Sequence, residues 1–393
     1  MAFVVVLAVM TIGDIISVRT KAFVPSVFVA ASLFLFGFWT FFPANIVDLS
    51  GLGGSVTTLS MLLLITHMGT MMSIKELARE WKTIAIALIG IGGIALGALT
   101  LGKVLFGWEA VVIATPPLTG GIVAALMMSE AAAAKGLMDL SVLAILMYVA
   151  QGFVGYPITA LMLKKEGTRL LKEYREGGRE AWLAKKQSSS AADSSNESKF
   201  RIFPPVPEKY NTTYMIFLKT GLVAWASVGF ANLTKGAISQ YVVCLIFGVI
   251  AAEIGFLDRK PLNISGSFGF FMTALMAFVF AGLSRATPDM IVRMAVPLAG
   301  IIIIGVAGMA ILSMLLGKFL GYTKEMSFAV ALTALYGFPP TYILPDEASK
   351  ALAENKEEYE YLMDNMLPKM LVGGFTTVTI ASVILAGIFI NLL

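Results

Sequence analysis

The sequence is poor in the residues on which soluble enzymes depend. Only 14% of its 393 residues are charged, and it contains one cysteine and one histidine. Soluble domains average about 25% charged residues, which cover the surface facing water. One cysteine excludes a disulfide framework, and one histidine excludes a histidine-rich metal site or a cysteine–histidine nucleophile pair. We therefore expect no enzyme activity and no cofactor, and the net charge of +4 is too small to indicate a nucleic-acid partner.

The chain is instead rich in apolar residues: 58% of it is hydrophobic, and its mean hydropathy is +0.83. A membrane-spanning helix needs roughly 20 mostly apolar residues. The first apolar run lacks the features of a cleaved signal peptide, so we count it as a span. The predicted spans lie near residues 2–18, 23–43, 54–73, 83–106, 140–163, 213–234, 238–257, 267–284, 291–317 and 368–393.

Two further apolar segments, 109–134 and 325–350, are interrupted by the double prolines Pro116-Pro117 and Pro339-Pro340. Proline removes a backbone donor, so neither segment is one regular helix. Irregular backbone at membrane depth persists only inside protein or against a water-filled cavity. We predict two re-entrant hairpins that enter the membrane and turn back, while a kinked spanning helix is the simpler alternative for either segment alone.

The basic residues test this topology. With the N-terminus outside and neither hairpin crossing, 22 of the 29 basic residues fall on the inner side and five on the outer side. Cytoplasmic loops carry such an excess in multi-pass proteins. We therefore place both termini outside the inner (plasma) membrane. The polar segment 165–212, with its serine-rich stretch 188–196, is predicted to be a cytoplasmic linker.

The parts before and after the linker, residues 1–164 and 213–393, have the same order of elements. Each has three spans, a glycine-rich fourth span, a proline-broken hairpin and a final span. The strings Leu101–Leu105 (LGKVL) and Leu316–Leu320 (LGKFL) precede the two hairpins. Five crossings per half invert the second half relative to the first. The predicted fold is all-α, with two inverted-topology repeats of five transmembrane helices and one hairpin each, as in secondary transporters.

The hairpin centres carry the candidate site, because freed carbonyls, hydroxyls and glycines suit a small carboxylate or Na⁺. The predicted substrate-binding residues are Thr115, Thr119, Gly120, Gly121, Tyr336, Gly337, Thr341 and Lys369. The predicted cation-binding or coupling residues, with Na⁺ held by backbone carbonyls, are Pro116, Pro117, Thr333, Pro339, Pro340, Asp346, Glu347 and Asn365. Alternatively, the acids are hydrated near the interface and Lys369 extends to the inner surface.

Several strings resemble the bacterial glutamate:sodium symporter family and, more distantly, the 2-hydroxycarboxylate (citrate:sodium) symporters. Val243–Ile250 followed by Ile254–Phe256 is similar to the seventh-span signature, and Thr66–Gly69 to the end of the third span. Lys21–Pro25 is similar to the start of the second span, and Tyr336–Thr341 to the Gly-Phe and Pro-Thr elements of the second hairpin. The resemblance implies a homodimer in which a transport domain carrying both hairpins moves like an elevator against a scaffold domain.

The first hairpin departs from this family, which carries a Gly-Gly-His-Gly-type loop where this chain has Pro116–Gly121 and no histidine. The expected function is therefore symport of glutamate or another small carboxylate with Na⁺ or H⁺. A cation/proton antiporter of a related inverted-repeat fold is the alternative. Antiport requires a titratable group at the site, for which Glu130, Asp346 and Glu347 are the candidates.

Overall fold

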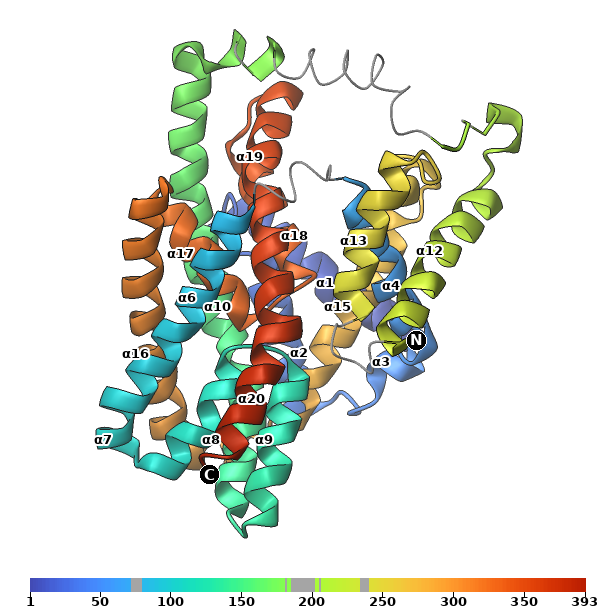
Figure 1. The fold of residues 1–393 in the computed structure, drawn as a ribbon. Coiled ribbons are helices and arrows are strands. Elements are labelled where there is room, and N and C mark those ends of the chain that lie inside the picture. The colour runs from blue at the N-terminus through green and yellow to red at the C-terminus, as the bar shows by residue number, and fades with distance from the viewer. Residues whose placement is uncertain (72–79, 181, 185–201, 205, 234–239) are drawn as a thin grey trace. The chain divides into compact units, whose positions relative to one another are not determined.

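The computed structural model describes residues 1–71, 80–180, 182–184, 202–204, 206–233 and 240–393, and every regular element in these residues is a helix (Figure 1). The helices long and apolar enough to cross a membrane span Ala2–Arg19, Trp81–Phe106, Met138–Gly178, Thr213–Leu233, Phe268–Arg285 and Pro288–Leu320. Helices of this length and composition indicate a multi-pass membrane protein. The segment 72–79, predicted to be an inner loop, and the serine-rich linker stretch 188–196 lie outside the described residues.

The helices follow one another in two runs of similar order. The first run is α1 (Ala2–Arg19), α2 (Ser26–Thr40), α3 (Ile46–Leu49), α4 (Ser55–Thr70), α6 (Trp81–Gly97) with η1 (Ala98–Gly102) and α7 (Lys103–Phe106), α8 (Trp108–Leu118), α9 (Ile122–Ala134), and α10 (Met138–Glu173) with η2 (Tyr174–Gly178). After η3 (Glu208–Tyr210), the second run is α12 (Thr213–Leu233), α13 (Gln240–Glu253), α14 (Pro261–Ile264), α15 (Phe268–Ala281) with η4 (Gly282–Arg285), α16 (Pro288–Leu320), α17 (Lys324–Leu332) with η5 (Thr333–Leu335), α18 (Pro340–Leu352), and α19 (Lys356–Phe375) with η6 (Thr376–Ala381) and α20 (Ser382–Ile390). Each run places a four-residue helix after its second long element and a helix pair before its last helix.

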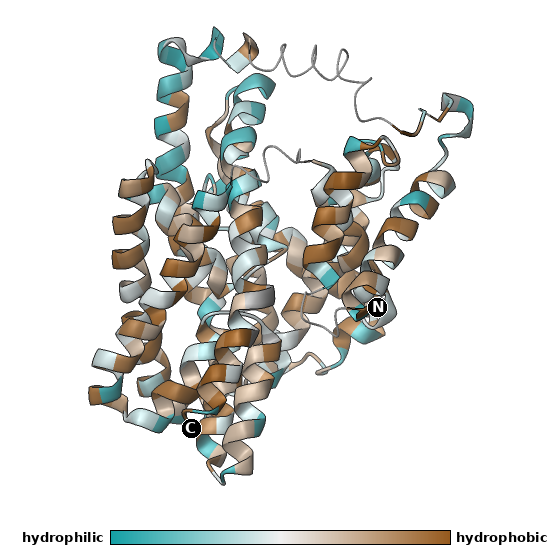
Figure 2. Cartoon of the chain, viewed as in Figure 1, coloured by the Kyte–Doolittle hydropathy of each residue, from teal (hydrophilic) through white to brown (hydrophobic). Residues whose placement is uncertain are grey.

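Two helices extend beyond the predicted spans, because hydropathy marks the apolar part of a helix and not its charged extension. The last helix begins at Lys356 and not near 368, with the Asn355 side chain accepting a hydrogen bond from the Glu358 N–H as its cap. Helix α10 continues past residue 163 to Glu173, inside the segment predicted as linker. Figure 2 shows hydrophilic residues gathered on both extensions. Charged side chains are good helix formers, so both helices continue beyond their apolar stretches.

The chain divides into two compact units by its internal contacts. One unit comprises Met1–Ser50, Glu80–Leu170 and Val279–Leu393, and the other comprises Gly51–Arg79 and Leu171–Phe278. Both double-proline segments belong to the first unit, which therefore contains the whole predicted site.

Close helix packing organises each unit. In the first unit α6 lies along α16, where a Cβ on Gly93 would be 2.4 Å from the Gly308 carbonyl oxygen. In the second unit α4 lies along α13, and a Cβ on Gly69 would be 2.3 Å from the Leu245 carbonyl oxygen. Small residues allow helix backbones to approach this closely in membrane proteins. The first helix of the second pair, α17, packs against both α6 and α16, whereas α18 packs against α19.

Candidate functional site

The first helix break lies between α8 and α9, at Thr119–Gly121. Pro116 and Pro117 occupy the last turn of α8 and are buried. Because proline has no N–H, the carbonyls of Val112 and Ile113 receive no bond from four residues ahead. The chain then turns and begins α9 with Gly121 as an extended N-cap residue. The double proline therefore weakens the end of α8, and the break follows it by two residues.

The second helix break lies between η5 and α18, at Tyr336–Pro339. Gly337 has a φ of +65°, a left-handed conformation that glycine adopts without steric cost. Pro340 is the first residue of α18, where its missing N–H leaves no helical bond unmade. Pro345 inside α18 leaves the carbonyl of Thr341 without a donor from four residues ahead.

Both breaks end against the same turn of the last helix. A Cβ on Gly121 would lie 3.1 Å from Val378 Cγ1, and one on Gly337 would lie 2.9 Å from Val378 Cγ2. Val378 belongs to η6, a π-helical turn. Such π-helical turns inside α-helices are frequent at functional sites. The structure thus brings together two tips that are more than 200 residues apart in the sequence.

The remaining contacts of the tips are equally close. A Cβ on Gly120 would lie 1.9 Å from Ser382 Cβ, so only glycine fits there without a shift. On the second tip, the Thr341 methyl group lies against Gly374, where an added Cβ would be 2.6 Å away. These contacts pack both tips closely against the last helix.

The threonine hydroxyls predicted to bind substrate differ in how they are satisfied. Thr115 donates to the Val111 carbonyl at 2.7 Å, Thr119 to the Pro116 carbonyl at 2.9 Å, and Thr333 to the Val330 carbonyl at 2.6 Å. Thr341 is fully buried, and its Oγ1 has no hydrogen-bond partner among the described residues. Since a buried hydroxyl without a partner costs free energy, Thr341 is the hydroxyl best placed to gain from a ligand.

Gln151 on α10 joins the two tips, and it was absent from the predicted site. Its Nε2 donates to the Gly120 carbonyl at 3.0 Å, while its buried Oε1 has no partner among the described residues. Gln151 lines a cavity of about 40 Å³ together with Tyr156 and Tyr336. A cavity needs about 10–15 Å³ to hold one buried water. The cavity therefore has room for a few waters or one small ion but not for a carboxylate substrate.

Tyr336 contacts α10 more extensively than the sequence predicted. Its hydroxyl donates to Thr159 Oγ1 at 2.9 Å, its ring lies 5.4 Å from that of Tyr156, and Gly155 leaves space for it. Signals for these contacts exist in the sequence, since polar residues such as Gln151 and Thr159 are unusual inside an apolar span. The polar residues of α10 therefore mark this part of the site in the sequence, whereas the prolines mark only the helix breaks.

The two predicted coupling acids do not join the tips. Asp346 accepts hydrogen bonds from Lys350 and from the Tyr359 hydroxyl, each at 2.7 Å. Glu347 accepts from the Ser17 hydroxyl at 2.8 Å, from the Ser26 N–H at 3.1 Å and from the Ser26 hydroxyl. Both acids lie more than one helical turn beyond Thr341 on α18, and Glu130 is exposed on α9.

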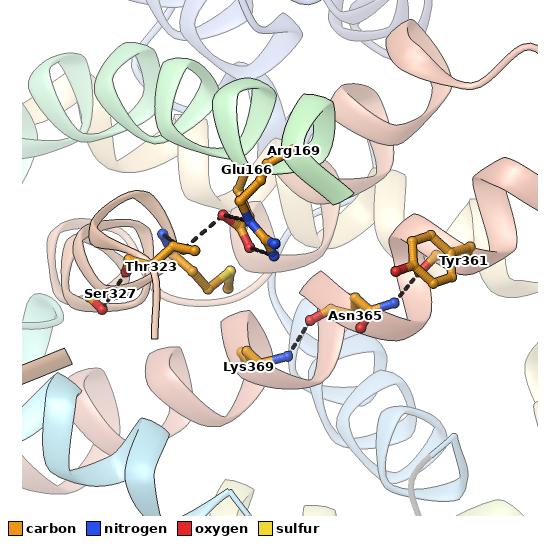
Figure 3. Close-up of polar contacts among 8 residues, drawn as sticks. Glu166, Arg169, Thr323, Ser327, Tyr361, Asn365 and Lys369 are labelled. Atoms are coloured by element: carbon orange, nitrogen blue, oxygen red, sulfur yellow. Dashed lines mark hydrogen bonds and ion pairs between the residues drawn. The ribbon is translucent and has the colours of Figure 1, made fainter. Parts of the chain in front are cut away.

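Asn365 and Lys369 lie one helical turn apart on α19 and are joined to each other and to Tyr361 by hydrogen bonds (Figure 3). Lys369 Nζ donates to the Asn365 carbonyl and lies 5.9 Å from the centre of the Tyr322 ring. The Asn365 side chain is occupied by a 2.8 Å bond to the Tyr361 carbonyl. Lys369 is one helical turn before Gly373, where an added Cβ would lie 3.1 Å from Thr333 Oγ1.

The start of α17 is held by side chains from α6 and α10. Thr323 caps α17 by accepting from the Met326 N–H, and its hydroxyl donates to buried Glu166 at 2.7 Å (Figure 3). Tyr322, in the loop before α17, shares a 2.9 Å bond with Thr83. Burial, opposed by that bond, raises the pKa of Tyr322 to about 12, so the phenol is neutral at physiological pH. The second helix pair is thus tied firmly at its base.

In comparisons with known proteins, no family model matches the sequence, and a search of curated proteins finds no match. The chemistry of the two tips is therefore the basis for assigning a function. Within the described residues no group of three or more histidine, cysteine or acidic side chains has the arrangement of a metal site. The polar groups at the tips are amide, hydroxyl and backbone oxygens, which suit a monovalent cation better than a transition metal.

Proposed function

We propose that the protein is a secondary active transporter that couples symport of a small organic anion, glutamate or another carboxylate, to Na⁺. The observation that carries this proposal is the meeting of two helix breaks at one π-helical turn in a helical membrane protein. Breaks of this kind expose backbone N–H and carbonyl groups where a substrate and its coupling ion bind together. The resemblance to glutamate:sodium symporters agrees with this assignment.

The order of the elements supports two inverted repeats. The second run repeats the first, including the four-residue helices α3 and α14 and the paired helices before each last helix. We propose that α8–α9 and α17–α18 are the re-entrant hairpins and that they approach the site from opposite sides. The linker between the repeats is then cytoplasmic, with both termini outside.

The division into two units supports an elevator-like mechanism. One unit holds both hairpins and the other holds α4, α12, α13, α14 and most of α15. We assign the first as the transport domain and the second as the scaffold, which would form the contact of a homodimer. In such a mechanism the transport domain is in equilibrium between two positions. A ligand shifts this equilibrium only if it binds the two states with different affinity, so the substrate and the ion together must favour the state in which the domain can move.

The coupling ion is assigned to the oxygens beside the tips. Among the described residues the Oε1 of Gln151 has no hydrogen-bond partner, and Gln151 and Phe153 both line the 40 Å³ cavity. The carbonyls of Phe153 and Thr341 receive no helical hydrogen bond, because Pro157 and Pro345 have no N–H. Neutral oxygens of this kind bind Na⁺ without a permanent charge in the membrane. Cation/proton antiport receives less support, because Asp346 and Glu347 are engaged away from the tips.

Uptake of labelled carboxylates into proteoliposomes tests the proposal. With an inward Na⁺ gradient, a substrate found by thermal-shift screening should accumulate above equilibrium, and collapsing the gradient should abolish accumulation. The variant Glu347→Gln should retain Na⁺-driven uptake, whereas Thr341→Val should lose most of it. Accumulation that is independent of both Na⁺ and H⁺ gradients, for every carboxylate tried, would exclude coupled symport.

A further inference from the structure

A second, larger cavity lies in the same unit as the tips. It measures about 350 Å³ and is lined by Arg285 at the end of η4, Ser129 on α9, Ser141 on α10 and five apolar side chains. Pockets for small molecules measure about 300–1,000 Å³, so a small organic anion fits here, unlike in the 40 Å³ cavity at the tips. A cavity of about 390 Å³ in the same unit also has cations, Lys165 and Arg169, but Glu166 and Glu325 line it as well. The Arg285 cavity combines space and a cation without an acidic side chain in its lining.

The polar groups of this cavity favour an anion. Arg285 is exposed and makes no side-chain hydrogen bond or ion pair among the described residues, and no acidic side chain lines the cavity. The hydroxyls of Ser129 and Ser141 bond to each other at 2.7 Å, so one of the two O–H groups remains free to donate. A guanidinium fork matches a carboxylate with two parallel hydrogen bonds. Arginine and a hydroxyl donor, surrounded by apolar walls, are the usual elements of a carboxylate site.

The two cavities follow one another along the same elements. Ser141 and Ile145 of α10 line the larger cavity, and Tyr148 and Gly152 line the smaller one. These positions are spaced i, i+4, i+7 and i+11 and therefore share one face of the helix. On η4, Leu283 lines the smaller cavity and Arg285 the larger. At 1.5 Å per residue, Ser141 and Gln151 are roughly 15 Å apart along the helix axis.

We propose that the Arg285 cavity is a receiving site for the carboxylate of the substrate, next along α10 to the smaller cavity at the tips. This inference rests on the proposed function and adds to it a binding site. Arg285 holds the carboxylate, and the serine pair supplies a further donor. The apolar walls from α9, α10 and α16 enclose the carbon chain of the ligand.

The variant Arg285→Gln tests the site, with Arg293→Gln as the matched control. Arg293 is close in the sequence but pairs with Asp289 at 3.0 Å and does not line the cavity. In phosphatidylcholine vesicles, we expect Arg285→Gln to raise the KM for uptake tenfold or more at a nearly unchanged maximal rate. Arg285→Lys should give a smaller increase, because lysine keeps the charge and loses the fork. Arg293→Gln should leave the KM unchanged, and an equal effect of both glutamine variants would overturn the proposal.

A second measurement does not depend on transport. Phenylglyoxal modifies accessible arginines, and mass spectrometry of the purified protein reports its rate at Arg285. Glutamate or succinate should slow this modification about tenfold and should leave Arg293 unaffected, while chloride should do neither. Protection of Arg285 without uptake of any carboxylate would refute the proposed function and support the binding site. Uptake without protection of Arg285 would support the proposed function and refute the binding site.

An anionic lipid headgroup presents the same phosphate or carboxylate chemistry to Arg285. Adding phosphatidylglycerol to the vesicles separates the two sources. If the soluble carboxylate is the ligand, the difference between Arg285→Gln and the unmodified protein is present in pure phosphatidylcholine. A difference that appears only with phosphatidylglycerol would assign the cavity to lipid and refute its role in substrate capture.

Discussion

The two helix breaks meet the same π-helical turn but are built differently. At the first break, the hydroxyls of Thr115 and Thr119 are satisfied by carbonyls of their own helix, and Gly120 lies directly against Ser382. At the second break, Gly337 requires a left-handed backbone, and Thr341 retains an unpartnered hydroxyl among the described residues. The first tip is therefore defined by steric fit, and the second by backbone conformation and unused polar groups.

This difference assigns separate roles to the tips. A tip whose polar groups are already bonded loses stability when it moves away from its neighbours, and gains nothing from a ligand. A tip with a buried unsatisfied hydroxyl is stabilised when a ligand supplies the missing bond. We infer that the first break forms a fixed wall and that the second break responds to substrate or ion.

Gly120→Ala should have the largest effect of any single substitution at the tips. The new Cβ would overlap Ser382 Cβ, and overpacking of this kind typically costs about 1–3 kcal/mol. Because the backbone of Gly120 is not in the left-handed region, the cost comes from the contact alone. We expect a lower midpoint of thermal unfolding and loss of uptake.

The double variant Gly120→Ala/Ser382→Gly should recover most of this loss, since it removes the opposing atom. Gly387→Ala is the matched control on α20, because nothing lies within 4 Å of its added Cβ. If the double variant is no better than Gly120→Ala, steric fit does not define the first tip.

Gly337→Ala should cost somewhat less and resist rescue. A non-glycine residue in the left-handed region costs about 1–2 kcal/mol, and the added Cβ also meets Val378 at 2.9 Å. The variant Val378→Ala removes the contact and leaves the backbone strain. We therefore expect Gly337→Ala/Val378→Ala to recover only part of the thermal stability, and full recovery would contradict a conformational requirement at the second tip.

Thr341→Val and Thr119→Val separate function from stability at the two tips. Thr341→Val removes an unpartnered hydroxyl, so the free energy of unfolding should stay constant or rise by about 1 kcal/mol, while uptake falls about tenfold. Thr119→Val breaks a 2.9 Å bond to the Pro116 carbonyl and should lower stability by about 1 kcal/mol with a smaller effect on uptake. Chemical denaturation and initial uptake rates, measured on both variants, distinguish this pattern from an equal role of the two hydroxyls.

Much of the fold follows from the sequence, because membrane helices are recognised by length and apolarity and breaks by proline. The double prolines mark both helix breaks, and the glycines beside them mark the tips. Hydropathy locates the apolar spans and not the charged helix ends beyond them, at Lys356 and Glu173.

The site is less predictable, since contact between distant residues depends on packing that a pattern does not encode. Nothing in the sequence pairs Gly121 with Gly337 through Val378, or Gln151 with the Gly120 carbonyl. The carboxylates attract attention because charge is rare in the membrane, but Glu347 is bonded to Ser17 and Ser26, far away in the sequence. Because polar residues are rare in membrane spans, the sequence identifies those that need partners. Only the fold shows which partner each of them has.

Tyr336→Phe should have the smallest effect and shows how the second tip is attached to α10. The change removes one bond, from the Tyr336 hydroxyl to Thr159 Oγ1, and keeps the ring against Gly155. We expect a loss of roughly 0.5–1 kcal/mol in the free energy of unfolding. Tyr156→Phe, on the neighbouring ring, is the control and should change stability less. If the second tip must separate from α10 in order to move, Tyr336→Phe will also increase the uptake rate at saturating substrate. If the second tip is as fixed as the first, the variant will lose stability without a change in the uptake rate.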